Sequence, residues 1–281
     1  MAANLVAATL RGGLYTRVVG RRIMFFQNLG STMDEADRHG AAGVVDGTVV
    51  VAETQKASRG RFGRTWVSQP GNLYFSVVFY PTLMALPLLS PLAGVAVVRA
   101  IAKTTSLRPR IKWPNDVLID GKKVAGILVE SVISGEEVRY AVLGIGVNVA
   151  LDPAELGELS TTATSLNATT EREVPREDLL RRLLQELDGL YLALRKGESP
   201  IEEWRGLLDT LGCRITASGG RESPAGIVEG ITEGVDELGN LQLRLDDGRL
   251  ITLTTGDVTL VQNGDPSGEP SEFRLPVGDG N

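Results

Sequence analysis

Residues 55–66 read Gln-Lys-Ala-Ser-Arg-Gly-Arg-Phe-Gly-Arg-Thr-Trp, which places four cationic side chains and two glycines within twelve positions. Arginine and lysine form charge-assisted hydrogen bonds to phosphate oxygens, and Gly60 and Gly63 allow the backbone to close around an anion. Runs rich in β-branched and aromatic residues at 48–53 and 73–80 predict strands on either side. We therefore expect a basic loop (residues 55–66) that hangs from a sheet, binds phosphate and becomes ordered when an anion neutralises its charges.

The rest of the chain is acidic, with a formal net charge of -6 and a pI near 5.1. A nucleic-acid-binding protein carries a broad basic face, so this charge disfavours DNA as a partner. The 30 residues before Ser31 are also fewer than the roughly fifty that a separate DNA-binding domain needs. The 281 residues, 42% of them hydrophobic, suffice for one large core and a second, small domain.

Cys213 and His39 are the single cysteine and the single histidine of the chain. A disulfide framework, a cysteine-built zinc site and a Cys-His pair are thereby excluded, and a Ser-His-Asp triad would have to use His39. His39 precedes Gly40 at the expected end of a short helix, where we expect it to cap the helix or face solvent. Catalysis would then depend on positioning and electrostatics.

The sequence predicts neither a signal peptide nor a membrane span. The apolar residues near the start are interrupted by Arg11, Arg17, Arg21 and Arg22. The long uncharged segment 65–98 contains four residues that would break a membrane helix, namely Pro70, Pro81, Pro87 and Pro91. We expect a cytoplasmic protein without a membrane partner.

The first two thirds of the chain show an α+β pattern. Thr32 and Glu35 have the spacing of a capping box and predict the start of a helix. Apolar spacing predicts a second helix over 91–103 and a long third helix after Pro175. Further strands are expected at 111–119, 123–132 and 138–149, with Asp120-Gly121 as the turn of a hairpin.

The last third has a different sequence pattern, which predicts short strands separated by glycine turns. Strands are expected at 214–217, 225–231, 241–245, 250–254 and 258–261. Five short strands in so few residues suggest a small barrel, which leaves no open sheet edge. Residues 263–281 are rich in glycine, proline and acidic residues and predict a disordered tail.

The segment Lys112-Trp113-Pro114-Asn115-Asp116, followed by Lys123, carries groups suited to nucleotide chemistry. A carboxylate such as Asp116 can hold Mg²⁺ on nucleotide phosphates, while Lys112 and Lys123 can offset charge that develops at the α-phosphate. Asp116 could equally accept a helical N–H or pair with a surface cation. Lys122 is expected to be solvated.

Three glycines in strand patterns, Gly126, Gly144 and Gly146, lack a Cβ and so permit close approach by a ligand. Asn148 follows them and could bond the edge of an adenine base. A lone Gly-x-Gly is weak evidence, so these positions gain weight only in combination with the other segments.

Ser31-Thr32, the basic loop, the 112–116 segment, Lys-Val-Ala-Gly-Ile-Leu-Val-Glu at 123–130 and Gly-Ile-Gly-Val-Asn at 144–148 together resemble the biotin protein ligases. The resemblance runs from about Leu14 to Val261. It implies a class II synthetase-like mixed sheet with helices over 1–211, followed by a small SH3-like β-barrel over 212–262. Two positions depart from the family pattern: Ser58 replaces the first glycine of GRGRxGRxW, and Met33 replaces an asparagine.

The resemblance implies that ATP, Mg²⁺ and biotin are used and that a lysine of the biotin carboxyl carrier protein of acetyl-CoA carboxylase, or of a related carboxylase, is modified. Biotin would contact Ser31, Thr32, Gln55, Arg59, Arg61, Lys123 and Gly126. ATP or the adenylate would contact Arg61, Arg64, Trp66, Lys112, Asn115, Asp116 and Asn148. The catalytic residues would be Lys123, Arg61 and Asp116, with Asp116 also holding the metal.

Two other functions stay open at this point. A lipoate or octanoate attachment enzyme is similar in fold, although the basic loop lacks the Arg-Arg-x-x-Gly-Gly-Gly pattern of lipoate ligases. A noncatalytic module that senses a nucleotide would bind ATP without chemistry. A homodimer is also conceivable, since the uncharged strand at 142–150 could pair edge to edge with a second copy.

Overall fold

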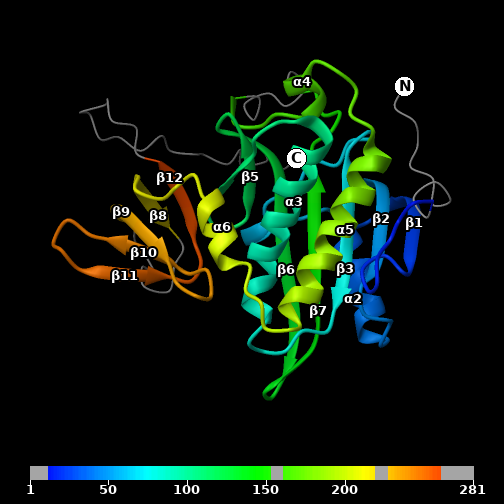
Figure 1. Ribbon diagram of the computed structural model, residues 1–281, viewed down its shortest axis with the longest axis horizontal. Coiled ribbons are helices and arrows are strands. Elements are labelled where there is room, and N and C mark those ends of the chain that lie inside the picture. The colour runs from blue at the N-terminus through cyan, green and yellow to red at the C-terminus, as the bar shows by residue number, and fades with distance from the viewer. Residues whose placement is uncertain (1–11, 153–160, 219–226, 261–281) are drawn as a thin grey trace, which may run out of the picture.

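The computed structural model describes residues 12–152, 161–218 and 227–260. A seven-stranded mixed sheet forms the centre, with helices on both faces and a smaller antiparallel sheet to one side (Figure 1). The α+β prediction is therefore confirmed. The expected tail at 263–281 lies outside the described residues.

The large sheet has the strand order β1-β2-β3-β7-β6-β5-β4. Its strands are β1 (Ile23–Leu29), β2 (Thr48–Gln55), β3 (Leu73–Phe79), β4 (Arg110–Lys112), β5 (Asp116–Ile119), β6 (Lys122–Ser134) and β7 (Glu137–Val147). Only the β1–β2 pair is parallel. The turn predicted at Asp120-Gly121 joins β5 to β6, with both residues in the left-handed region.

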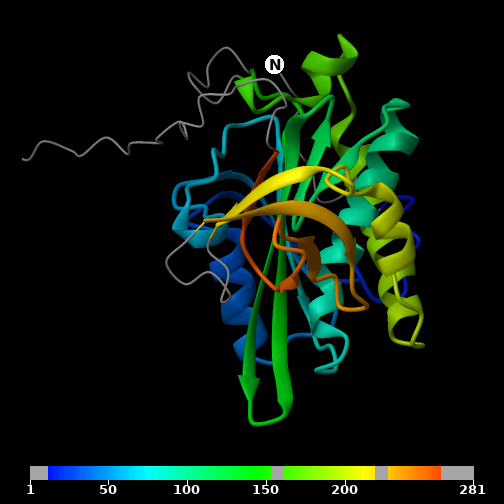
Figure 2. The same cartoon turned by 90° about the vertical axis from the view of Figure 1, so that its left-hand side faces the viewer.

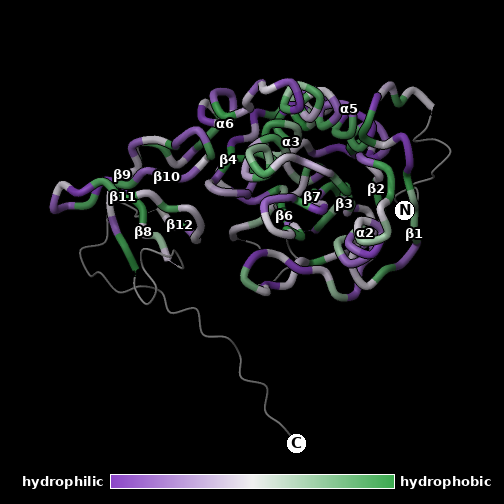
Figure 3. The backbone as a smooth tube through the Cα atoms, turned by 90° about the horizontal axis from the view of Figure 1, so that it is seen from below, coloured by the Kyte–Doolittle hydropathy of each residue, from purple (hydrophilic) through white to green (hydrophobic). Residues whose placement is uncertain are grey.

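The helices form two layers around this sheet (Figure 3). On one face lie α3 (Leu89–Thr105), α5 (Arg176–Leu194) and the short α6 (Ile201–Leu207), and on the other lies α2 (Thr32–Ala41). A short helix, α4 (Leu166–Thr170), precedes α5. Single 3₁₀ turns lie at η1 (Arg61–Gly63) and η2 (Leu86–Leu88).

Alternation along the strands sorts side chains between the two faces. Leu143, Ile145 and Val147 of β7 join the large core beneath α3 and α5. Val142 and Met33 belong to a smaller cluster beneath α2. Because side chains of a strand alternate with a period of two, Gly144 and Gly146 face the same side as α2.

Within the described residues, one helical segment, Leu86–Thr105, is long and apolar enough to cross a membrane, with a mean hydropathy of 1.5. Two thirds of it is buried inside the protein, 67%, against the sheet and α5. A helix that is apolar on nearly every side and buried in this way is typical of a protein core.

The five strands expected in the last third are present and form one antiparallel sheet, whose two end strands are not paired with each other among the described residues, as closure of the expected barrel would require. They are β8 (Arg214–Ser218), β9 (Ile227–Val235), β10 (Leu241–Arg244), β11 (Leu250–Leu253) and β12 (Asp257–Leu260). Their order is β11-β10-β9-β8-β12, and Figure 2 shows them strongly curved. We call this unit the C-terminal sheet. Residues 225 and 226, expected at the start of its second strand, lie outside the described part.

Two expectations about local structure are wrong. The strand predicted at 111–119 is two antiparallel strands, β4 and β5, because Pro114 between them cannot donate to a ladder. The strand predicted to pair edge to edge in a dimer is β7, which has β3 and β6 on its two sides and thus no free edge. His39 lies in the last turn of α2, as expected, where its side chain is partly exposed and its Nε2 is 3.1 Å from Glu35 Oε1.

The capping-box prediction is also wrong, since Ser31 and not Thr32 is the N-cap of α2. Ser31 Oγ accepts from the Met33 amide at 3.2 Å. The Thr32 amide donates instead to Gln55 Oε1 at 2.8 Å, and Glu35 pairs with Arg38. Serine is also the slightly better N-cap residue, and the acceptor from β2 satisfies the amide of Thr32.

Candidate active site

A cavity of about 440 Å³ lies on the face of the sheet that carries α2. All thirteen residues that the resemblance assigns to biotin or ATP line it: Ser31, Thr32, Gln55, Arg59, Arg61, Arg64, Trp66, Lys112, Asn115, Asp116, Lys123, Gly126 and Asn148. Segments far apart in sequence meet here because strand ends and the basic loop converge on one face. Tyr74, Leu128, Leu151 and Asp257 also line the cavity, and the sequence analysis did not single them out.

The floor of the cavity is built from Gly126 and Gly146, which lie opposite each other on β6 and β7. A Cβ added to Gly126 would lie 2.7 Å from the Trp66 ring, and one added to Gly146 would also lie 2.7 Å from it. These glycines therefore accommodate the indole of Trp66, since a side chain at either position would collide with it. Their expected role beside a ligand stays a prediction.

Gly144, the third of these glycines, accommodates another side chain in the same way. A Cβ at Gly144 would lie 2.4 Å from the sulfur of Met33, the residue that departs from the family pattern. Met33 is buried, with 5% of its surface exposed, and lines the cavity. The thioether therefore fills the space above Gly144 at the end of the cavity that α2 closes.

This end of the cavity is polar. The hydroxyl of Ser76 donates to Thr32 Oγ1 at 2.9 Å, and the amide of Thr32 donates to Gln55 Oε1. Ser31, Thr32 and Gln55 therefore present hydroxyls and a carbonyl oxygen at the positive end of a helix dipole. Such a set suits a neutral ligand with N–H and C=O groups.

The other end carries cations around one carboxylate. Lys123 Nζ lies 2.7 Å from Asp116 Oδ1 and 5.1 Å from the centre of the Trp66 ring. Lys112 faces Asp116 in the β4–β5 register. Burial lowers the pKa of Lys112 below its usual value, and the positive charges of Lys123 and Arg64 lower it further, against the opposing effect of Asp116.

Arg59 of the basic loop is held by acidic side chains of the protein itself. Its guanidinium forms a bidentate pair with Glu130, at 3.0 and 2.8 Å, and contacts Asp34 of α2. The hydrogen bond to Glu130 is the main reason that the pKa of Arg59 is raised. No external anion is required to offset this charge, contrary to the expectation for the loop.

Arg61 and Arg64 extend from the loop to the C-terminal sheet. Arg61 donates to Thr255 Oγ1 at 2.9 Å, to the Gly256 carbonyl at 3.1 Å and to Asn115 Oδ1 at 3.2 Å. Arg64 pairs with Asp257. Burial lowers the pKa of Arg61, and Arg64 adds to this, while Asp116 opposes it.

Backbone geometry explains the second glycine of the loop but not the first. Gly63 has a φ of +72°, which favours glycine, whereas Gly60 is extended and a Cβ there would make only an ordinary contact. Phe62 also has a positive φ, +56°, and its exposed ring packs against the guanidinium of Arg61 at 4.9 Å. The tip of the loop is therefore a strained turn, a feature found at functional sites.

Asn148 lines the cavity but is largely engaged with the backbone. Its Nδ2 donates to the carbonyl of Thr164 at 3.1 Å and, more weakly, to that of Lys123 at 3.5 Å. The role expected for it at an adenine edge stays a prediction. Its position holds the segment after β7 against the strand that carries Lys123.

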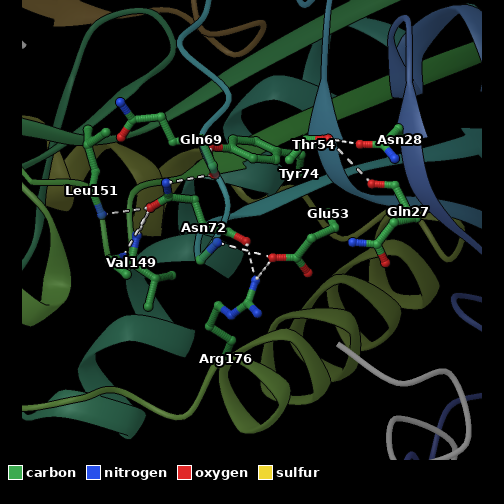
Figure 4. Close-up of polar contacts among 12 residues, drawn as sticks. Gln27, Asn28, Glu53, Thr54, Gln69, Asn72, Tyr74, Val149, Leu151 and Arg176 are labelled. Carbon is green, nitrogen blue, oxygen red and sulfur yellow. Dashed lines mark hydrogen bonds and ion pairs between the residues drawn. The ribbon is translucent and has the colours of Figure 1, made fainter. Parts of the chain in front are cut away.

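A buried polar network supports that segment from behind (Figure 4). Asn72 Oδ1 accepts from the amides of Val149, Ala150 and Leu151 at 2.8, 3.0 and 3.0 Å. Arg176, at the start of α5, pairs with Glu53 at 2.8 Å and donates to the Asn72 carbonyl at 3.1 Å. Both members of this ion pair are almost fully buried, so the network fixes the wall to the core.

Among the described residues, no three His, Cys, Asp or Glu side chains are grouped as a ready-made metal site. Asp116 is one accessible carboxylate on the cavity wall, with 24% of its side chain exposed. Mg²⁺ commonly binds through one or two carboxylates together with substrate phosphates and water. The residues present thus fit an ion that arrives with a nucleotide, and not an ion held by the protein alone.

Comparison with known proteins agrees with this geometry. The model of the Biotin/lipoate A/B protein ligase family matches residues 26–148, and that of the Biotin protein ligase C terminal domain matches residues 220–261. The fold and cavity thus define a ligase of the biotin and lipoate class.

Comparison with individual relatives identifies the family within this class of ligases. The chain is 34% identical to the bifunctional ligase/repressor BirA of Bacillus subtilis over 87% of its length and 76% of that protein. It is 38% identical to the biotin–[acetyl-CoA-carboxylase] ligase of Paracoccus denitrificans over 75% of its length and 90% of that protein. The structure of the Aquifex aeolicus biotin protein ligase in complex with biotin and ATP is similar, with a TM-score of 0.69 and 29% sequence identity. The match covers 86% of this chain and 99% of that chain. The chain belongs to the biotin protein ligase family.

Proposed function

We propose that the protein activates biotin with ATP and transfers it to one lysine of a biotin carboxyl carrier protein, in acetyl-CoA carboxylase or a related carboxylase. In the first step a biotin carboxylate oxygen attacks the α-phosphorus, and the bond from that phosphorus to pyrophosphate breaks. In the second step the ε-amine of the carrier lysine attacks the carbonyl of biotinyl-5′-AMP. An amide forms, AMP leaves and the amine releases a proton.

One observation carries this proposal: a neutral polar end and a cationic end meet in a single cavity. Ser31, Thr32 and Gln55 at the first end have the hydrogen-bonding groups that a ureido ring requires. Lys112 and Lys123 at the second end have the charge that an acyl phosphate requires. The cavity of about 440 Å³ lies in the size range of small-molecule sites.

The chemistry needs alignment more than proton transfer. The biotin carboxylate is already ionised at neutral pH, so no histidine base is required for the first step. Lys123 would contact the carboxylate and the α-phosphate oxygens, and its contact with Asp116 orients its ammonium group. Arg61 would bind the phosphate from the loop side, and Trp66 would form a wall beside the adenylate.

Mg²⁺ is the metal that we propose, bound by Asp116 together with nucleotide phosphates. Its contribution would be to neutralise the phosphate charge. The basic loop would lie over the mixed anhydride and exclude water that would hydrolyse it. We also propose that the reaction takes place in the cytoplasm. A boundary between the two domains near residue 212 and a homodimer are further proposals.

Pyrophosphate exchange tests the activity directly. Exchange into ATP should require biotin and should not occur with lipoate or octanoate. Lys123→Ala should abolish it, whereas Lys122→Ala, at the exposed neighbouring position, should leave it near the wild-type rate. Exchange with lipoate alone would identify a lipoate ligase, and ATP binding without exchange would identify a nucleotide sensor. Normal exchange in Lys123→Ala would remove this lysine from the site.

A further inference from the structure

A chain of side-chain hydrogen bonds runs from the polar end of the cavity to the base of the basic loop. Gln55 Nε2 donates to Ser68 Oγ at 3.1 Å, and Ser68 Oγ lies 2.9 Å from Ser58 Oγ. Ser58 Oγ lies 2.6 Å from the carbonyl oxygen of Trp66. Ser58 is buried, with 8% of its surface exposed, while Gln55 and Ser68 are half-buried.

The direction of this chain follows from the inventory of donors. The carbonyl of Trp66 can only accept, so the single hydroxyl hydrogen of Ser58 is directed to it. Ser68 must then donate to Ser58, which leaves Ser68 Oγ as the acceptor for Gln55. Every donor therefore points the same way, from the cavity toward the loop.

This direction fixes the orientation of one amide. Gln55 presents Nε2 to Ser68 and Oε1 to the amide of Thr32, at 2.8 Å. A flipped amide would place Nε2 against the Thr32 N–H and Oε1 against a hydroxyl whose hydrogen is already used. Both ends of the side chain therefore oppose the flip, and the group available to a ligand is a carbonyl oxygen with a second lone pair.

We infer that Ser58 is a positioning residue for biotin, which acts through Ser68 to hold Gln55 Oε1 toward the cavity as an acceptor for a ureido N–H. This inference rests on the proposed function. It assigns a role to a position where the family pattern has glycine, which cannot supply the hydroxyl. It also couples two events, because the chain ends on the carbonyl of Trp66 and loses its last acceptor when the loop base moves away.

The coupling predicts a defect confined to one substrate. Ser58→Ala and Ser58→Gly each remove the hydroxyl, so only the Thr32 amide still holds the orientation of the Gln55 amide. We expect the KM for biotin in pyrophosphate exchange to rise about tenfold, as for loss of one buried hydrogen bond. The KM for ATP should change less than about twofold. Ser58→Thr retains the hydroxyl and should restore most of the affinity for biotin.

Two further measurements separate positioning from general damage. In a Gln55→Ala background, Ser58→Ala should raise the KM for biotin no further, because its effect passes through Gln55. In NMR spectra of the protein without substrates, Ser58→Ala should shift the Thr32 backbone amide and the Gln55 side-chain NH₂ signals, since both are joined to the chain.

The results of these experiments test the role of Ser58 separately from the proposed ligase activity. An unchanged KM for biotin in Ser58→Ala, additive effects in the double variant, or unchanged Thr32 and Gln55 signals would each overturn the role of Ser58. An equal rise in both KM values would indicate a merely structural defect and would also overturn it. A wild-type protein without biotin-dependent exchange would refute the proposed function, while the NMR comparison would still decide whether the hydrogen-bonded chain exists.

Discussion

Replacement of Gly146 by alanine should loosen the basic loop without unfolding the sheet. The added Cβ would lie 2.7 Å from Cε2, 2.8 Å from Nε1 and 2.9 Å from Cζ2 of Trp66. Carbon atoms in contact normally lie about 3.5–4.0 Å apart, so the indole must move by about 1 Å. Gly146 lies in β7 and has no positive φ, so alanine fits its backbone without strain.

The effect of the added methyl group depends on whether the sheet or the basic loop moves to accommodate it. Overpacking of this size costs about 1–3 kcal/mol in a core that cannot move. The sheet is fixed by β3 and β6 on either side of β7, whereas Trp66 ends a loop. We therefore expect the cost to appear as lost loop closure, which corresponds to release of biotinyl-AMP about 5- to 100-fold faster. The Tm should stay nearly constant, since loss of glycine itself stabilises the fold by about 0.4–1 kcal/mol.

The assay is a chase of preformed biotinyl-AMP from the purified enzyme, together with thermal unfolding. Gly189→Ala is the matched control, since Gly189 is exposed on α5, meets open space and does not line the cavity. It should raise stability by about 1 kcal/mol and leave release unchanged. Trp66→Phe removes Nε1 and Cζ2, so the double variant with Gly146→Ala should recover part of the retention.

A large fall in Tm with normal retention of the intermediate would refute this reasoning. It would mean that Trp66 is a fixed part of the floor and that the sheet, not the loop, absorbs the added methyl group. Equal release from Gly146→Ala and Gly189→Ala would refute it as well.

Three more changes test other parts of the structure. Asn72→Ala leaves three backbone amides without their acceptor and should lower the free energy of unfolding in urea by about 2–4 kcal/mol; a loss below about 1 kcal/mol would contradict the buried network. Asp257→Asn removes the charge opposite Arg64, a pair exposed enough to contribute at most about 1 kcal/mol, so biotinyl-AMP release should accelerate about two- to fivefold, and slower release would argue against the contact. Burial raises the pKa of Asp46 despite its hydrogen bond with Tyr191, so its ionised form destabilises the fold above that raised pKa. Asp46→Asn should therefore raise the Tm at pH 7, and the gain should fade as the pH falls through the raised pKa of folded Asp46 and be lost below 3.8, the ordinary value for the unfolded chain; a gain independent of pH would count against this account.

The site residues could be predicted from the sequence because charged residues and glycines stand out within or next to strand patterns. Lys112 pairs with Asp116, and Lys123 pairs with Leu118, two residues along β5 from Asp116, so local pairing alone brings the three residues together. The period of two along β7 likewise places Gly144 and Gly146 on one face before any tertiary contact is known.

What fills the space above those glycines could not be predicted. Trp66 lies 80 positions before Gly146, at the end of a loop, and no periodicity relates the two residues. The sequence pattern indicates only that a Cβ is missing, which fits a ligand and a side chain equally well. The same limit applies to the N-cap of α2, where Gln55 from another element accepts from the amide of Thr32.

The partners of the basic loop in the C-terminal sheet were also beyond the reach of sequence reasoning. Thr255 and Asp257 lie in a stretch with no concentrated charge or motif, almost two hundred positions after Arg61 and Arg64. Their contact arises from the way the two sheets are placed side by side, which is set by contacts such as Trp113 Nε1 to the Gly239 carbonyl at 2.9 Å.

These contacts set a lower limit on how far the enzyme can be shortened for practical use. A fragment that stops before Thr255 would keep every residue of the matched ligase segment 26–148. It would nevertheless lack two hydrogen-bond acceptors of Arg61, the Thr255 hydroxyl and the Gly256 carbonyl, and also Asp257, which pairs with Arg64. A minimal labelling reagent built from this chain must therefore extend at least through Asp257, even though the cavity itself is formed mainly by the first half of the protein.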